Sequence, residues 1–326
     1  MSETKQSWRT LLVKAIVATA VFAVANVVVY WSSSYFDHLR DYRSTVNGLL
    51  ASPNVTTVLL GDSHVAHLNQ TSLADDVYNL AAPGDSLREG YAKLRYVLGR
   101  QTHIRKVYLS VDLNMFGAGR LRSANGAFAD QYLVLSNSPY GLDKGRLGGI
   151  LNAVPLLNDD FVQYARARIH DALTHKLTAA VKPNEPPWFE LSETERAARA
   201  QRTGDGDHSQ VGQLDEPFAW IARIVALAHA HNVVVIGVRY PAQPDYFATV
   251  SRLDVERMND RLARSGLNEI RDLRYAFDDP RCFEDPDHVS PLGATTVARL
   301  LGLSSVPASP SPCVDPSSAV SRKSHS

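Results

Sequence analysis

After residue 52 the chain alternates between short apolar runs and longer segments with helical spacing of their apolar residues. Four runs have the length and composition of buried strands: 55–60, 76–81, 104–113 and 233–241. Four segments have the apolar spacing of helices: 86–100, 216–232, 251–266 and 291–302. Strands that alternate with helices are typical of a parallel sheet covered by helices, so the pattern predicts an α/β fold.

The N-terminus has a different pattern. Residues 11–31 are almost continuously apolar and are interrupted only by Lys14. A helix needs ~20 apolar residues to cross a bilayer, so we expect a transmembrane anchor here. Lys5, Arg9 and Lys14 then place residues 1–10 in the cytoplasm by the positive-inside rule. The predicted location is the inner membrane, crossed once, with the remainder of the protein in the periplasm.

Two alternatives to the anchor remain open. The tripeptide Ala23-Val24-Ala25 has the form of a signal-peptidase site, so the segment could be a cleaved signal peptide. It could also be a buried helix of a soluble protein. An anchor and a signal peptide both imply export of the rest of the chain.

The rest of the chain divides by composition. Residues 32–52 are polar and predict a juxtamembrane stalk or helix, and residues 53–303 contain the predicted sheet. Within them, residues 117–215 lack the regular alternation, which indicates a helical insertion that could cap a site. The tail at 304–326 is rich in Ser and Pro and is expected to be disordered.

Composition excludes two classes of protein. With 326 residues, 44% of them hydrophobic, the chain can bury a large core and is not a disordered protein. Its 34 basic and 34 acidic residues balance, so no overall field favours binding to nucleic acid.

The two cysteines, Cys282 and Cys313, could form a disulfide in an exported protein, or they could be two buried thiols.

Ser63 lies in the stretch Gly61-Asp62-Ser63-His64, directly after the first predicted strand. A serine at this position is either a nucleophile at a strand end or an ordinary turn residue, because turns favour Gly, Asp and Ser. The stretch is not the G-x-S-x-G elbow of α/β-hydrolases, since Val65 occupies the second glycine position.

A second informative stretch is Asp285-Pro286-Asp287-His288, shortly before the last predicted helix. The spacing allows the Asp285 carboxylate to accept from Nδ1–H of His288, which leaves Nε2 free to take a proton from a serine. The alternative is a capped helix start with a surface histidine. Both stretches belong at the carboxyl edge of a parallel sheet, where sites of such folds lie.

Together these blocks resemble the SGNH/GDSL hydrolase superfamily, over roughly residues 54–302 apart from the insertion. The resemblance implies a flavodoxin-like, three-layer parallel sheet, with Ser63 as nucleophile, His288 as general base and Asp285 as its partner. The stretch Tyr78-Asn79-Leu80-Ala81-Ala82-Pro83-Gly84 matches the second block, which implies that the backbone N–H groups of Gly84 and Ser63 bind the oxyanion.

The third block of that family departs from the usual pattern. Asp112 stands where an asparagine is expected, and Asn114 follows two residues later. A carboxylate cannot donate to an oxyanion, so Asn114 is the better candidate for a side-chain donor.

The combination with an N-terminal anchor is similar to exported proteins that acetylate cell-surface polysaccharides, such as those of alginate acetylation. This resemblance implies a serine esterase or O-acyltransferase that acts on acetyl esters of a glycan, with a membrane-bound O-acyltransferase as a possible partner. The alternative is a catalytically silent polysaccharide-binding or assembly subunit.

Further residues are candidates for substrate contact: His64, His67, Asp112 and Trp188. The pairs His170 with His175 and His229 with His231 lack the i, i+4 spacing of a helical zinc site, so no metal is expected. No cofactor is expected either.

Overall fold

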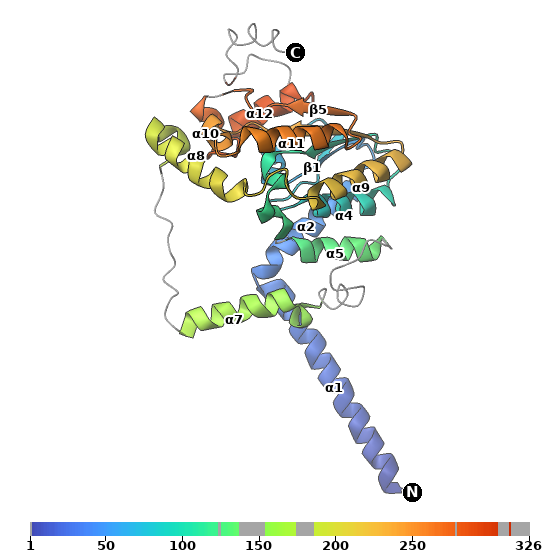
Figure 1. The fold of residues 1–326 in the computed structure, drawn as a ribbon. Coiled ribbons are helices and arrows are strands. Elements are labelled where there is room, and N and C mark those ends of the chain that lie inside the picture. Colours follow the sequence, from blue (N-terminus) through green and yellow to red (C-terminus); the bar gives the residue numbers. More distant parts are fainter. Residues whose placement is uncertain are drawn as a thin grey trace, which may run out of the picture. The chain divides into compact units, whose positions relative to one another are not determined.

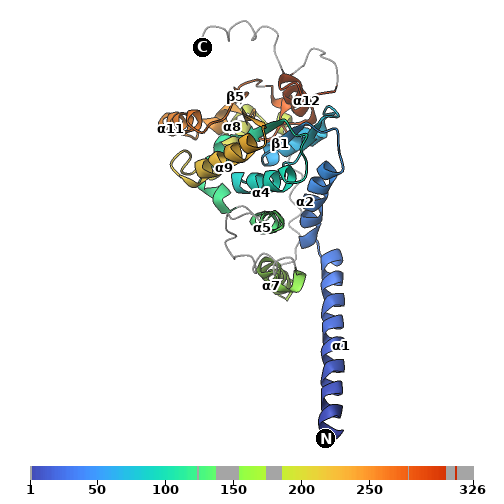
Figure 2. The same ribbon diagram turned by 90° about the vertical axis from the view of Figure 1, so that its right-hand side faces the viewer.

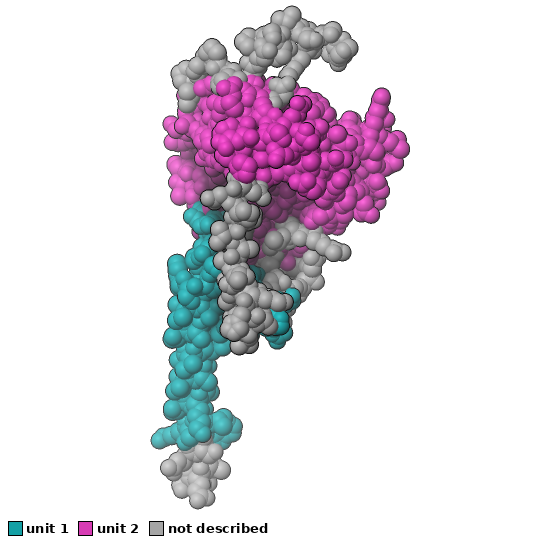
Figure 3. Space-filling view, turned by 90° about the vertical axis from the view of Figure 1, so that its left-hand side faces the viewer, with its two compact units in different colours: residues 1–44, 139–181 teal, residues 45–138, 182–326 magenta. Residues whose placement is uncertain are grey.

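The structure is a computed structural model, and it describes residues 2–122, 125–136, 154–173, 186–277, 279–305 and 313. The chain forms two compact units, coloured separately in Figure 3. Unit 1 comprises residues 1–44 and 139–181, and unit 2 comprises residues 45–138 and 182–326. Most of the predicted disordered tail lies outside the described residues.

Unit 1 is built on the long N-terminal helix α1 (Ser2–Ser32). Its residues Trp8–Ser32 have a mean hydropathy of 2.3, so this helix is long and apolar enough to cross a membrane. Its apolar side chains are exposed, as at Val21, which is 63% accessible. A buried helix of a soluble protein would hide these side chains, so that alternative does not fit.

Part of the predicted insertion packs with α1 inside unit 1. The short helix η4 (Pro155–Leu157) meets α1, where the Leu156 N–H donates to Asn26 Oδ1 at 2.9 Å. Helix α7 (Asp159–Leu173) follows, and Phe161 stacks on Phe36 at the start of α2 (Tyr35–Leu50). The stretch predicted as an insertion, 117–215, is divided between the units: residues 139–181 belong to unit 1, and residues 117–138 and 182–215 belong to unit 2.

Unit 2 contains the predicted parallel sheet. Its five strands lie in the order β2-β1-β3-β4-β5, and every neighbouring pair is parallel. The strands are β1 (Thr57–Leu60), β2 (Val77–Asn79), β3 (Lys106–Ser110), β4 (Val234–Arg239) and β5 (Glu269–Asp272). The first four were predicted, whereas β5 was not.

The sheet core is apolar on both faces because helices cover both. Val58 pairs with Tyr78 of β2 and Val107 of β3, and Val107 pairs with Val235 of β4. Val58, Val107 and Val235 are each 0% exposed. Continuous apolar strands of this kind are what a doubly covered parallel sheet requires.

Helices form the two outer layers. On one face α4 (Leu87–Leu98) and α9 (Glu216–Ala230) pack side by side, and on the other α12 (Pro291–Leu300) contacts η1 (His67–Gln70) (Figures 1 and 2). The remaining helices are α3 (Ser63–Ala66), η2 (Leu113–Phe116), η3 (Ala118–Arg122), α5 (Gly126–Leu135), η5 (Trp188–Glu190), α8 (Glu193–Asp207), α10 (Pro244–Phe247), α11 (Arg252–Ala263) and η6 (Pro280–Cys282).

The strand order decides where a site can form. The chain turns from β1 to β2 in one direction and then crosses back past β1 to β3. Loops leave the carboxyl ends of β1 and β3 in opposite directions at such a switch point, which opens a crevice between them. The two loops concerned carry Ser63 and Asp112.

Candidate active site

Ser63 begins α3 immediately after the turn that ends β1. A Cβ at Gly61 would lie 2.4 Å from Val65 Cγ2 and 2.7 Å from Ser110 Cβ, so only glycine fits this turn. The Asp62 carboxylate caps the helix by accepting from the His64 N–H at 3.2 Å. These contacts hold Ser63 half-buried at the carboxyl edge of the sheet.

The base loop, residues 283–290, lies between η6 and α12. Asp285 Oδ1 accepts the backbone N–H of Asp287 at 3.1 Å and of His288 at 2.8 Å, which folds the loop back on itself. The same carboxylate lies 2.9 Å from His288 Nδ1 through either oxygen. A disulfide between Cys282 and Cys313, with Cα atoms 6.0 Å apart, joins the start of this region to the tail.

The sheet brings the two predicted stretches together. His288 Nε2 lies 2.8 Å from Ser63 Oγ, across 225 positions of sequence. Because Asp285 accepts from Nδ1–H, Nε2 carries the lone pair, and the Ser63 hydroxyl donates to it. Ser63, His288 and Asp285 therefore form a continuous Ser-His-Asp hydrogen-bond chain.

The charges of the Ser-His-Asp hydrogen-bond chain favour uptake of a proton by His288. Burial would raise the pKa of Asp285, but hydrogen bonds from the His288 ring and backbone lower it well below its usual value. Burial would lower the pKa of His288, but the hydrogen bond to Asp285 and the negative charges of Asp287 and Asp285 together raise it above its ordinary value. A carboxylate that stays ionised thus stabilises the imidazolium that forms when His288 takes a proton.

His67 stacks on His288. Its ring centroid lies 4.7 Å from that of His288 with an interplanar angle of 26°, and its Nδ1 is 3.1 Å from the Val289 carbonyl oxygen. Glu284 lies 3.6 Å from the same nitrogen. His67 therefore packs against the base loop, and its predicted contact with substrate remains a prediction.

A buried polar cluster lies beneath Ser63. His64 Nδ1 is 3.0 Å from Asp112 Oδ2 and its Nε2 is 3.2 Å from Asp287 Oδ2. Asp112 also accepts the Tyr240 N–H at 2.6 Å. Asp62 is fully buried and accepts from Asn114 at 2.8 Å.

Arg120 in η3 completes this cluster with an ion pair to Asp62 at 2.8 Å. Burial would raise the pKa of Asp62, but the positive charges of His64 and Arg120 and the hydrogen bond from Asn114 lower it. Asp62 is therefore held ionised next to Ser63.

Three of the predicted substrate residues are buried. His64 is 3% exposed, Asp112 is 4% exposed, and their polar atoms bind other protein groups. Trp188 is 2% exposed and lies under Arg199, whose guanidinium carbon is 6.0 Å from the ring centroid. All three side chains are interior in this structure, and their contact with a substrate stays a prediction.

The predicted oxyanion donors are one side chain, that of Asn114, and the backbone N–H groups of Gly84 and Ser63. Asn114 is 1% exposed and directs its amide nitrogen at Asp62, which accounts for the irregular third block. Gly84 has a φ of +82°, a conformation that favours glycine, and lies in the loop that runs beside β1, where Ala82 N–H donates to Gly61 O at 3.3 Å. The backbone N–H groups of Gly84 and Ser63 are thus the better candidates, although their role stays a prediction.

Buried charges hold the Gly84 loop in place. Lys93 Nζ donates to Asp85 Oδ2 at 2.6 Å, and Asn125 Nδ2 donates to Asp85 Oδ1 at 2.7 Å and to the Pro83 carbonyl at 2.9 Å. Burial raises the pKa of Asp85 to about 6, although Lys93 and Asn125 oppose this. The turn that presents Gly84 is therefore anchored on both sides.

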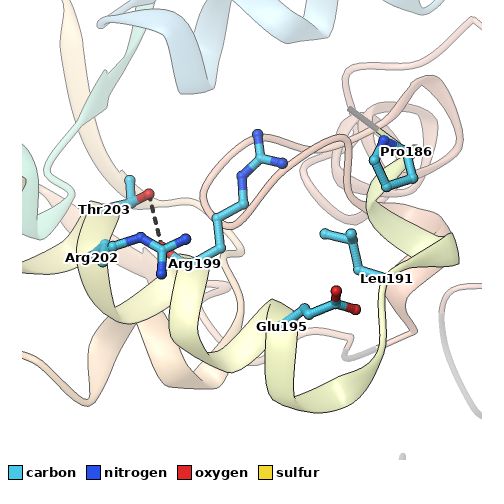
Figure 4. Close-up of a pocket in the computed structure, with 6 residues that line it drawn as sticks. All are labelled: Pro186, Leu191, Glu195, Arg199, Arg202 and Thr203. Carbon is cyan, nitrogen blue, oxygen red and sulfur yellow. Dashed lines mark hydrogen bonds between the residues drawn. The ribbon is translucent and has the colours of Figure 1, made fainter. Parts of the chain in front are cut away.

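A surface pocket lies elsewhere on unit 2. It has a volume of about 390 Å³, and Figure 4 shows its lining residues on α8 and the segment before it. The lining is Pro186, Leu191, Glu195, Arg199, Arg202 and Thr203. None of these belongs to the Ser-His-Asp chain.

The described residues that could hold a metal ion are those of the buried cluster. Two groups have ligand atoms close enough: His64 with Asp287 and His288, and His64 with Asp62 and Asp112. In both groups the His64 nitrogens already bind carboxylate oxygens, so hydrogen bonding accounts for the arrangement.

Sequence reasoning missed the roles of Asp62, Asp287, Arg120 and Lys93. The position of Asp62 was a usable signal, since it lies two residues after the end of a buried strand, where the crevice of a parallel sheet opens. No local pattern in the sequence could have indicated the role of Arg120, because its ion-pair partner Asp62 is distant in sequence.

Comparison with known proteins found no family model that matches this chain and no curated protein with significant similarity. The residues and their geometry carry the functional argument.

Proposed function

We propose that the protein is an exported, membrane-anchored serine esterase or O-acyltransferase of the SGNH type that acts on acetyl esters of a cell-surface glycan. The observation that carries the proposal is the contact between His288 Nε2 and Ser63 Oγ at 2.8 Å, with Asp285 bound to the opposite ring nitrogen at 2.9 Å. Few structural roles require a serine, a histidine and a carboxylate in this order at a strand end.

The mechanism follows from this geometry. The Ser63 oxygen adds to the ester carbonyl carbon while its proton passes to His288 Nε2. The tetrahedral intermediate then breaks its bond to the alcohol, which leaves with the proton from His288. Water or a sugar hydroxyl attacks the acyl-serine by the reverse sequence, which regenerates Ser63 and releases an acid or a new ester.

Further features support the proposed substrate and the proposed cellular location. The triad is partly exposed, with the His288 side chain 19% exposed and that of Asp285 30% exposed, so a polymer chain could reach it from solvent. The apolar helix Trp8–Ser32 would hold the enzyme at the inner membrane, with unit 2 in the periplasm. There the acyl group would come from a membrane-bound O-acyltransferase partner or from the glycan itself.

The flavodoxin-like strand order supports the same family of folds. The order β2-β1-β3-β4-β5 places the Ser63 loop at the switch point, where such folds bind their ligands. This is the arrangement expected for an SGNH-type hydrolase.

The test is covalent labelling of the full chain in detergent with a fluorophosphonate probe, with the labelled peptide identified by mass. Wild type should label at Ser63, and Ser63→Ala and His288→Ala should not. Ser251→Ala is the matched control, because Ser251 caps α11 and contacts Asp254 instead of a histidine. It should label as wild type does.

One observation favours the silent alternative. Asn114, the only side-chain donor predicted for the oxyanion, is held by Asp62. A folded wild-type protein that stays unlabelled would overturn the enzyme proposal and support a polysaccharide-binding or assembly subunit. Labelling at Ser63, followed by transfer of acetyl from an aryl ester to an added oligosaccharide, would establish the transferase form over the esterase.

A further inference from the structure

His64 connects two parts of the site that are distant in sequence. Its Nδ1 faces Asp112, directly after β3, at 3.0 Å, and its Nε2 faces Asp287 of the base loop at 3.2 Å. The side chain is 3% exposed, so no solvent competes for either nitrogen.

The two contacts define the protonation state of His64. Each ring nitrogen faces a carboxylate oxygen, which only accepts hydrogen bonds when ionised. Burial raises the pKa of Asp112, but the hydrogen bonds that it accepts from His64 and the Tyr240 N–H oppose this and favour its ionised form. A neutral imidazole would point a lone pair at one of these carboxylates. Both nitrogens therefore carry a proton, and His64 is an imidazolium.

The imidazolium ties the base loop to the sheet. Asp287 stands between Asp285 and His288, and its backbone N–H donates to Asp285 Oδ1 at 3.1 Å. Asp112 is in turn fixed by the Tyr240 N–H and by the Ser110 hydroxyl at 3.0 Å. A shift of Asp287 would move the base loop and with it the Ser63 to His288 contact.

The charge of His64 also acts on the base. The His64 and His288 rings meet edge to face, with centroids 5.2 Å apart. The positive charge of His64 opposes protonation of His288, whereas Asp287 and Asp285 favour it.

Further charged or titratable groups surround His64. On its own loop Asp62 raises its pKa, and His64 in turn interacts with Asp207 and His208 at the end of α8. Arg120 of η3 interacts with Asp62, and the Tyr240 hydroxyl after β4 interacts with Asp112 and Asp62, two of the carboxylates that act on His64.

We propose that His64 is a positioning residue: a permanent imidazolium that holds Asp287, and through it the catalytic base, against the nucleophile and that sets the working pH of His288. The proposal rests on the acyl-transfer role of Ser63 proposed above. It assigns Asp287 as the partner through which His64 acts.

The test uses His64→Gln and Asp287→Asn in the full chain in detergent, with His103→Gln as the matched control. His103 is an exposed histidine before β3. The measured quantity is the rate of fluorophosphonate labelling of Ser63 as a function of pH, whose acidic midpoint reports the pKa of His288. Circular dichroism verifies that each variant is folded.

The two variants should shift the midpoint in opposite directions. Loss of the His64 charge raises it by about one pH unit, and loss of the Asp287 charge lowers it by a similar amount. Both variants should also label at least tenfold more slowly than wild type at their best pH. His103→Gln should match wild type in both quantities. A purely structural role would slow labelling without opposite shifts, so an unmoved midpoint in folded His64→Gln overturns the proposal.

A second readout separates this proposal from the enzyme proposal. In full-length protein labelled with ¹⁵N-histidine, nuclear magnetic resonance should show one histidine with both ring nitrogens protonated up to about pH 8, and Asp287→Asn should make it titrate. Wild type that fails to label at Ser63 would refute the enzyme function alone. A His64 signal that titrates near its ordinary pKa would refute the imidazolium bridge, whether or not Ser63 reacts.

Discussion

His208 should make the protein sensitive to acid. It lies at the end of α8, where its Nδ1 is 2.7 Å from Thr249 Oγ. The Thr249 hydroxyl already donates to the Tyr246 carbonyl at 3.0 Å, so His208 Nδ1–H must be the donor to Thr249. His208 Nε2 is buried without a hydrogen-bond partner among the described residues. A second proton would therefore have no acceptor.

The size of the effect follows from the pKa. Burial lowers the pKa of His208 from 6.5 to about 4. The unfolded chain binds this proton near pH 6.5 and the folded chain only near 4, so stability falls as the pH drops through this window. At the lower end of the window the folded state should have lost about 3 kcal/mol of its free energy of unfolding.

The assay is urea unfolding of the full chain in detergent at several pH values, followed by tryptophan fluorescence. His208→Asn keeps a donor toward Thr249 but cannot take up the proton, so it should remove about 3 kcal/mol of the acid sensitivity. His103→Gln, at an exposed histidine, should leave it unchanged. If wild type and His208→Asn lose stability in parallel between neutral pH and pH 4, the buried neutral tautomer is the wrong explanation.

Three further predictions concern the site and its supports. Asp285→Asn should reduce turnover of an aryl acetate by about 10⁴-fold while circular dichroism stays unchanged, because the base loses the partner that orients it; a loss under tenfold would contradict that role. Replacing Cys282 and Cys313 together by alanine should lower the free energy of unfolding by about 3.7 kcal/mol, since their disulfide spans 31 positions. An unchanged midpoint of urea unfolding would show that the disulfide does not restrict the unfolded chain. Lys93→Met should cost about 3–5 kcal/mol in the same assay, because it leaves Asp85 buried without its cation; a stable variant with normal labelling of the nucleophile would mean that the Gly84 turn needs no such anchor.

Local pattern was enough to predict four of the five strands and the two motifs. Residues 55–60, 104–113 and 233–241 are apolar because both faces of their strands are covered, and this leaves a signal in the sequence itself. The loop from Asp285 to His288 was also predictable, since partners three positions apart meet within one turn. The long apolar helix α1 is predictable for the same reason, as its length and composition alone define it.

Other elements had weak local signals. The edge strand β5 is short, and its residues Glu269 and Asp272 are exposed, so it lacks an apolar run. The stretch at 154–173 reads as part of an insertion, yet Leu156 binds Asn26, 130 positions earlier. Contacts of this range leave no periodicity to detect.

The sequence by itself determined four of the five strands, where Ser63 and His288 lie relative to them, and which cysteines could pair. Only the tertiary structure decided what surrounds them. His64 and Asp287 are 223 positions apart, and the strand order brings them within 3.2 Å. In the same way, the buried Asn114 side chain donates a hydrogen bond to Asp62, because an ionised carboxylate that is excluded from water must be stabilised by hydrogen-bond donors of the protein.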